Sequence, residues 1–180
     1  IDGALVRGAH VLAMVPRNRL YPEHNEYKSL PTFRLTVGTT EALSALDDLR
    51  SRDSTEPRLL IAVDDYAELV TDDWADDGEL ELRERLHAHL SYLWEQKDEL
   101  NLDFVFSAQQ PRFSQFHGSY ESSGATVLLF GRRMAASQAT MAFGTQDDAL
   151  VTPVELELGQ ALARHPGGGL EVATMWARGL

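Results

Sequence analysis

The sequence contains no cysteine among its 180 residues. A disulfide framework is therefore excluded, and so are thiolate metal sites and a cysteine nucleophile. No apolar run approaches the roughly 18 residues that a membrane-spanning helix needs, and no basic and then apolar start marks a signal peptide. We therefore expect a soluble, cytoplasmic piece of protein, which could be the soluble domain of a membrane-anchored protein only through regions outside this sequence.

Positive charge is also scarce. Lys and Arg together number 16 against 28 Asp and Glu, so the formal net charge is -12. This balance argues against a free-standing cationic binder of nucleic acids or of anionic membranes, and any contact with DNA would have to be local. Most of the excess lies in residues 64–84, where ten acids face the single base Arg83. We interpret this stretch as a solvated acidic loop that leads into a helix.

The length and the 43% hydrophobic content predict one globular domain over residues 1–180. The chain begins at Ile1 rather than Met, so we expect it to be a segment of a longer protein.

Short continuous apolar runs are the clearest pattern in the chain, and they are typical of strands buried on both faces. They lie at residues 9–15, 59–63, 104–106 and 126–130, with a shorter candidate strand at 33–37. Between them, apolar residues at steps of three and four predict helices. These residues are Ala42, Ala45, Leu46 and Leu49, and then Leu82, Leu86, Leu90, Leu93 and Trp94.

The alternation of strand and helix predicts an α/β fold with a mostly parallel sheet flanked by helices. Two late runs, at residues 160–165 and 170–176, flank Pro166–Gly169 and predict a hairpin. We expect this hairpin to finish the sheet with antiparallel pairing.

The strand pattern at 59–63 runs directly into two adjacent carboxylates, Asp64 and Asp65. Ligands of open α/β sheets bind at the carboxyl ends of strands, so this has the form of a Walker B element. The first acid can hold the water shell of a hydrated Mg2+, and the second can polarise the attacking water. The alternative is a strand that simply ends in a polar turn.

A second buried strand pattern ends at Phe106 and is followed by Gln109. An amide near the end of such a strand can sense a γ-phosphate or orient water. Alternatively, Gln109 is an ordinary hydrogen-bonding group of a loop.

With these elements in order, the chain from residue 9 onward resembles the motor domain of the FtsK/HerA superfamily, which includes the FtsK and SpoIIIE translocases, conjugative coupling proteins and type VII secretion ATPases. The matching segments are LIAVDDYAEL at 60–69, SAQQP at 107–111, the strand and helix at 127–143, and LGQALAR at 158–164. The acidic pair followed by Tyr66 is similar to the corresponding sequence of type VII secretion ATPases, and the nearest members are these ATPases or the conjugative coupling proteins. The motifs are short, and their order and spacing carry the resemblance.

The resemblance implies an incomplete RecA/ASCE-like P-loop NTPase core. It implies ATP and Mg2+ as cofactors of the parent protein, with Asp64 at the metal and Asp64 and Gln109 at the nucleotide. Asp64, Asp65 and Gln109 would be the catalytic residues. The parent would form a homo-oligomeric, hexameric ring that acts on a translocated protein or DNA.

Two departures from the family pattern matter. No G-x-x-x-x-G-K-[ST] element is present, because the one Lys-Ser pair, Lys28-Ser29, lacks the required glycines. The isolated chain is therefore not expected to be an ATPase or to bind a cofactor tightly, and activity would require an upstream P-loop. The family's arginine finger aligns with Ala139, which leaves Arg132 and Arg133 as displaced trans-acting substitutes or as a surface charge pair.

Residues 111–124, rich in Ser, Gly, Phe and Tyr, predict one long irregular loop. Its Arg112, Phe113, Phe116 and Tyr120 combine aromatic faces with a little positive charge, a composition that can stack on bases or pack on a peptide. We expect a contact loop for the translocated polymer. The alternative is that the two phenylalanines anchor the loop in the core.

Two functional hypotheses follow. The chain is part of an ATP-driven ring translocase of the FtsK/SpoIIIE type that moves protein or DNA in secretion, conjugation or chromosome transfer. Alternatively, it is a degenerate, non-hydrolysing ATPase-like module that docks a partner or regulates a neighbouring motor.

Overall fold

The computed structural model describes residues 5, 8–16, 27–70, 77–108, 126–130, 133–134, 154–157, 160–165 and 170–174. The chain divides into two compact units, Ile1–Gln109 and Gln110–Leu180, and each is described by itself. The assignment of residues 1–180 to a single domain stays a prediction.

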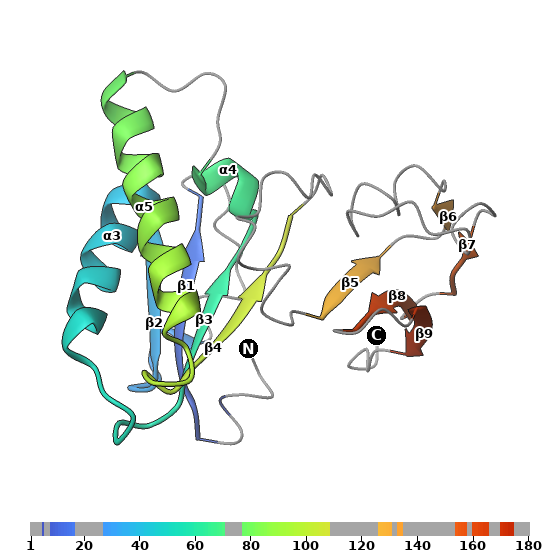
Figure 1. The fold of residues 1–180 in the computed structure, drawn as a ribbon, viewed down its shortest axis with the longest axis horizontal. Helices are drawn as coiled ribbons and strands as arrows, with labels where there is room; N and C mark the ends of the chain where they lie inside the picture. Colours follow the sequence, from blue (N-terminus) through green and yellow to red (C-terminus); the bar gives the residue numbers. More distant parts are fainter. Residues whose placement is uncertain are drawn as a thin grey trace. The chain divides into compact units, whose positions relative to one another are not determined.

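The first unit contains a four-stranded parallel sheet (Figure 1). The order of its strands is β2-β1-β3-β4. The strands are β1 His10–Val15, β2 Phe33–Val37, β3 Leu59–Val63 and β4 Leu102–Phe106. All neighbouring pairs in this sheet run parallel, as the alternation of strand and helix patterns predicts.

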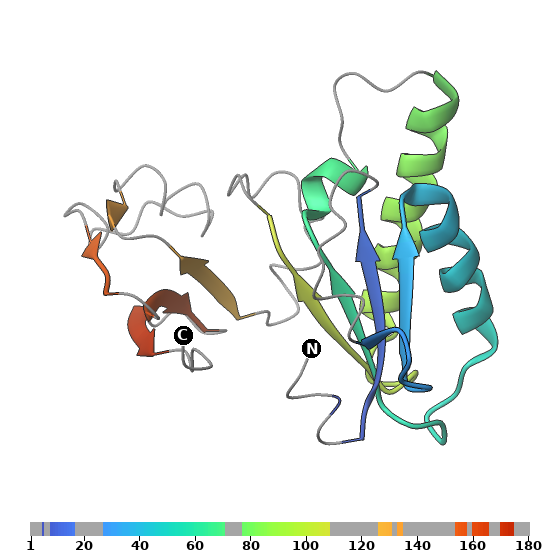
Figure 2. The same cartoon turned by 180° about the vertical axis from the view of Figure 1, so that it is seen from behind.

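Helices α3 (Thr39–Asp47) and α5 (Asp77–Glu95) lie side by side on one face of this sheet, as both views of the ribbon show (Figures 1 and 2). The short 3-10 helix η1 (Asp48–Ser51) follows α3, and α4 (Tyr66–Val70) follows β3. The helices in the described part of the chain include no candidate membrane span.

The core of the first unit follows the apolar patterns of the sequence in β1 and the helices. The prediction that 104–106 is buried on both faces is wrong, because Val105 in β4 is exposed. Strand β1 is buried on both faces from Val11 to Val15, as a continuous apolar run predicts. Strand β3 alternates instead, with Leu59, Ile61 and Val63 buried and the residues between them only partly buried. The helices contribute Ala42, Ala45 and Leu46 from α3, and Leu86, Leu90, Leu93 and Trp94 from α5. On β1 and β2, Val11, Ala13 and Phe33 form a further cluster, against which Leu5 and Tyr27 pack.

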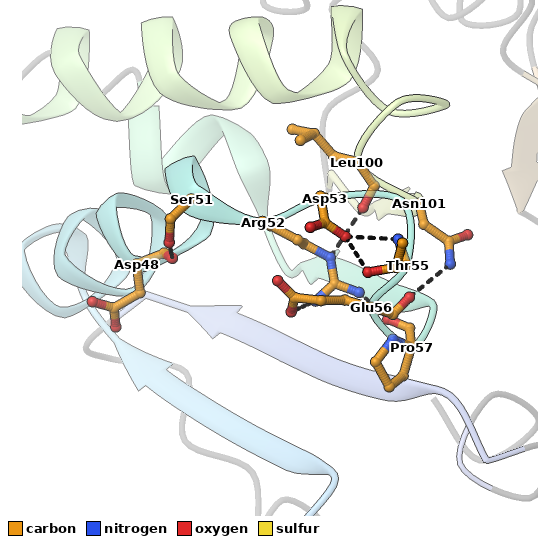
Figure 3. Close-up of polar contacts among 9 residues, drawn as sticks. All are labelled: Asp48, Ser51, Arg52, Asp53, Thr55, Glu56, Pro57, Leu100 and Asn101. Atoms are coloured by element: carbon orange, nitrogen blue, oxygen red, sulfur yellow. Dashed lines mark hydrogen bonds and ion pairs between the residues drawn. The ribbon is translucent and has the colours of Figure 1, made fainter.

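The amino-terminal ends of β3 and β4 are closed by a polar network around Arg52 (Figure 3). The Arg52 side chain is only 7% exposed. Its Nε donates to the carbonyl of Leu100 at 3.0 Å, one terminal nitrogen donates to Glu56 at 3.0 Å, and the other donates to the carbonyl of Pro57. Nδ2 of Asn101 donates to the carbonyl of Glu56 at 3.0 Å. The connection before β3 is thereby joined to the turn before β4.

The second unit contains a three-stranded antiparallel sheet with the order β5-β8-β9. Its strands are β5 Val127–Phe130, β8 Gln160–Arg164 and β9 Leu170–Thr174. Leu156 and Leu162 form its buried cluster, with Val127, Leu129 and Leu170 packed around them. A separate pair joins β6 Arg133–Met134 to β7 Val154–Glu155.

The predicted fold class is confirmed: an α/β parallel sheet flanked by helices, with an antiparallel hairpin near the end of the chain. One detail of the prediction is wrong, because the hairpin β8-β9 does not finish the parallel sheet. The other edge of β8 pairs with β5, which was expected to belong to the parallel sheet, so the hairpin's hydrogen bonds are satisfied within a second sheet.

Candidate functional site

The carboxyl ends of the parallel strands bring the predicted acidic pair next to the end of β4. Asp64 and Asp65 follow β3 directly, and Ser107 follows β4 directly. Val63 and Phe106 are partners in the parallel register, so the residues after them are neighbours too. In open α/β sheets this edge is where ligands bind.

Asp64 presents a carboxylate that is held on one side and open on the other. Its backbone N–H donates to the carbonyl of Met14 at 2.9 Å, which ties the end of β3 to β1. Its Oδ1 accepts a hydrogen bond from the Ser107 hydroxyl at 2.6 Å. Within the part of the chain that the structure describes, Oδ2 has no hydrogen-bond or ion-pair partner, and the residue is half-buried. Asp64 can therefore accept a further hydrogen bond, such as one from metal-bound water.

Asp65 differs from Asp64 in both backbone and burial. Its φ is 46°, in the left-handed region that Asp tolerates better than most residues. Its carbonyl accepts from the N–H groups of Glu68 at 2.9 Å and Leu69 at 3.3 Å, so the turn at Asp65 starts α4. Asp65 is 7% exposed. The two adjacent carboxylates thus lie in different environments.

Ser107 connects the two acids, and the sequence patterns did not single it out. Its N–H donates to the carbonyl of Val63 at 2.9 Å, and its carbonyl accepts from the N–H of Tyr66 at 2.8 Å. Its hydroxyl accepts from the N–H of Asp65 at 2.9 Å and donates to Asp64. Its place directly after an apolar strand, like that of Asp64, is the signal that could have identified it.

Tyr66 links this edge to helix α5. The ring is fully buried and packs edge-on against Phe106, with 5.1 Å between the ring centroids. Its hydroxyl lies 2.5 Å from Nδ1 of His87 on α5. The chain from the acidic pair into α4 is therefore anchored to a long, well-packed helix.

His87 and His89 lie two residues apart on α5 and have different neighbours. Nε2 of His89 lies 2.5 Å from a terminal nitrogen of Arg50, and its Nδ1 lies 3.7 Å from Asp47. Burial lowers the pKa of His89, and the positive charge of Arg50 lowers it further against the opposing effect of Asp47. The two histidines thus contact different elements and do not form a ligand pair.

Arg83, the one base of the acidic segment, is buried rather than solvated. It donates to the carbonyl of Glu68 at 2.6 Å and to the carboxylate of Glu79 at 2.9 Å. The first bond joins α5 to α4, and the second lies within α5. Arg83 therefore has a structural role that composition alone did not indicate.

Most of the other predicted site residues lie outside the described residues. These are Gln109, the four residues of the expected contact loop (Arg112, Phe113, Phe116 and Tyr120), and Arg132. Arg133 lies in β6, where its backbone pairs with that of Glu155. Their roles stay predictions.

The donor set at this edge fits part of a Mg2+-nucleotide site. No group of three or more His, Asp or Glu side chains that could hold a metal ion is present among the described residues. Protein-bound Mg2+ usually keeps several waters and is held through one or two carboxylates plus substrate phosphates, so the open oxygen of Asp64 suits that role. The described segments include no glycine-rich turn before a helix that would wrap the phosphates.

No family model and no curated protein matches the sequence. Among solved structures, the chain is similar to the pCW3 conjugation coupling protein TcpA, in its monomer form with ATPgS, with a TM-score of 0.67 and 11% identity. It is also similar to the cytoplasmic domain of the type VII secretion ATPase EccC of Thermomonospora curvata, with a TM-score of 0.61 and 16% identity.

These similarities cover 94% and 99% of this chain, but only 53% of the coupling protein and 22% of the secretion ATPase. The chain therefore spans about half and about a fifth of the lengths of these two proteins. The fold that the resemblance implies is confirmed, because the chain folds like parts of these two proteins.

Proposed function

We propose that the chain is part of an ATP-driven ring translocase of the FtsK/SpoIIIE type, which moves protein or DNA. The observation that carries this proposal is the placement of Asp64 and Asp65 at the carboxyl end of β3, beside the end of β4, in a chain with this fold. That edge is where a parallel α/β sheet places its ligand.

In this proposal each residue has a defined task. Asp64 accepts hydrogen bonds from the water shell of Mg2+, and Asp65 polarises the attacking water. Gln109 orients that water or contacts the γ-phosphate. When bound, Mg2+-ATP supplies the phosphoanhydride bond whose hydrolysis drives movement.

The remaining predicted residues act between subunits and on the substrate. Arg132 and Arg133 would reach a neighbouring subunit of the ring and stabilise negative charge there. The contact-loop residues Arg112, Phe113, Phe116 and Tyr120 would touch the translocated polymer through aromatic and cationic contacts.

One observation favours a second function, a non-hydrolysing module that docks a partner or regulates a neighbouring motor. Asp65 is 7% exposed, so its carboxylate has little access to an attacking water in this arrangement. The sequence also contains no G-x-x-x-x-G-K-[ST] element. A P-loop in any residues that precede Ile1 would favour the motor, and its absence there would favour the module.

The substitution Asp65→Asn separates the two functions. Asn also tolerates a left-handed φ, so the variant removes the charge while keeping the turn that starts α4. For the motor we expect ATP turnover to fall by about two orders of magnitude or more with nucleotide binding preserved. Turnover and calorimetric ATP binding would be measured on the natural protein, including any residues before Ile1.

The matched control is Asp98→Asn, which neutralises an exposed acid in the turn after α5. It should leave turnover unchanged. Equal turnover in Asp65→Asn and Asp98→Asn would reject the motor assignment. The 180-residue chain alone should bind Mg2+-ATP weakly and not hydrolyse it, and submillimolar affinity with turnover would show a phosphate site within this sequence.

A further inference from the structure

We propose that Ser107 is a positioning residue that fixes the Asp64 carboxylate and the turn at Asp65. This inference rests on the proposed function, because the group that Ser107 positions is the proposed magnesium-side carboxylate. It concerns a hydroxyl that the sequence motifs did not assign.

The direction of the hydrogen bonds around Ser107 is determined by chemistry. An ionised carboxylate only accepts, so the single hydroxyl proton of Ser107 is donated to Oδ1 of Asp64 at 2.6 Å. The backbone N–H of Asp65 only donates, so it bonds to a lone pair of the same Oγ at 2.9 Å. The bonds therefore run from Asp65 N–H through Ser107 Oγ–H to Asp64 Oδ1. Such chains polarise one another and strengthen each bond.

The fold of the sheet does not depend on the hydroxyl of Ser107. The backbone of Ser107 continues the β3-β4 pairing through Val63 and Tyr66, and any residue except proline would keep those bonds. The residue as a whole is exposed, so its side chain fills no space in the core. Removal of the hydroxyl should therefore change the acidic pair without unfolding the sheet.

The position of Asp64 matters because Mg2+ demands near-ideal octahedral geometry. A carboxylate that lies at the end of a strand and has no second partner could rotate about its side-chain bonds. The bond from Ser107 holds Oδ1, so Oδ2 remains as the oxygen that can face a metal-bound water. Partners that orient a ligating group in this way typically change metal affinity or activity by about 10- to 100-fold when they are removed.

The first test uses the 180-residue chain and does not depend on nucleotide. Amide hydrogen exchange and NMR side-chain couplings would be compared in wild type, Ser107→Ala and Ser107→Thr. In Ser107→Ala we expect the Asp65 amide to exchange about five- to tenfold faster and Asp64 to average over several rotamers. The amide of Tyr66 should keep its protection, because its acceptor is a backbone carbonyl.

Ser107→Thr keeps the hydroxyl and should restore both signals. Ser51→Ala is the matched control, because among the described residues its hydroxyl bonds only the carbonyl of Asp48, at 3.4 Å. It should leave the Asp65 amide and the Asp64 rotamer unchanged. Unchanged exchange and couplings in Ser107→Ala would overturn the inference.

The second test measures ATP turnover of the natural protein. Ser107→Ala should lower kcat by about tenfold with little change in KM, and Ser107→Thr should recover most of it. Wild-type turnover in Ser107→Ala, alongside reduced turnover in Asp65→Asn, would overturn the positioning role while leaving the proposed function intact. Absence of turnover in the wild-type protein would contradict the proposed function, and the exchange and coupling data would still decide whether Ser107 fixes Asp64.

Discussion

The two ends of the parallel sheet use polar side chains in opposite ways. At the amino-terminal end, the Arg52 guanidinium donates hydrogen bonds to the carbonyls of Leu100 and Pro57 and to the carboxylate of Glu56 (Figure 3). The Asn101 side chain donates a further bond to the carbonyl of Glu56. At the carboxyl end, Asp64 keeps one oxygen open within the described part of the chain. At one end a buried arginine bonds groups of its own fold, whereas at the other end a carboxylate oxygen can still accept a hydrogen bond.

Both ends rely on the same backbone device. Among the described residues, Asp65 and Asn101 are the non-glycine positions with a positive φ, at 46° and 54°. Asn101 lies just before β4 and Asp65 just after β3. A left-handed backbone position therefore lies in the turn at each of these two strand ends.

The largest expected difference between the two ends is in stability. Arg52→Ala leaves the carbonyls of Leu100 and Pro57 without their donor, so we expect the free energy of unfolding to fall by about 2–4 kcal/mol. Asp64→Asn should change it by less than about 1 kcal/mol, because an amide oxygen can still accept from Ser107. Urea unfolding followed by circular dichroism measures both values. Equal losses in the two variants would contradict the division between a structural and a functional end.

A smaller effect is expected at Asn101. Asn101→Ala loses the bond to Glu56 and places a Cβ-bearing residue without a polar side chain at φ 54°, so we expect a loss of about 1–2 kcal/mol. Asn101→Gly loses the same bond but accepts the left-handed backbone freely. The same unfolding measurement should therefore show Asn101→Gly to be less destabilised than Asn101→Ala. Equal free energies of unfolding in the two variants would show that the left-handed backbone at this position does not affect stability.

The smallest effect concerns the protonation of Asp53, at the amino-terminal end of the parallel sheet. Hydrogen bonds from the hydroxyl and N–H of Thr55 hold the pKa of the Asp53 carboxyl below its usual range. A carboxyl whose pKa is lower in the folded state stabilises the fold above its unfolded pKa of about 4, and this contribution is lost as the pH falls through the folded value. Thr55→Ala removes the hydroxyl, so the Asp53 pKa should rise toward its usual range in an NMR titration. No change in that titration would show that the N–H of Thr55 alone sets the pKa.

Much of the fold could be predicted from local patterns. The apolar run at 59–63 predicted β3, and the spacing of Leu86, Leu90 and Leu93 predicted α5. Both were predictable because the buried positions of a strand or helix recur in the sequence with the period of that element. The hairpin at β8 and β9 was also predicted. The sheet to which this hairpin belongs was not predicted, because the amino-acid sequence of an antiparallel strand does not specify which distant strand it pairs with.

The sequence by itself determined that Asp64 and Asp65 follow a buried strand and that one base, Arg83, lies among ten acids. Tertiary structure alone decided that Asp64 is half-buried while Asp65 is buried. It also decided that the Arg83 side chain bonds the Glu68 carbonyl and so joins α5 to α4. It also decided that Ser107, 43 residues away from Asp64, holds its carboxylate. The reason is physical: the end of a strand follows from local burial, but the partner of a side chain follows from the register between strands that are distant in the chain.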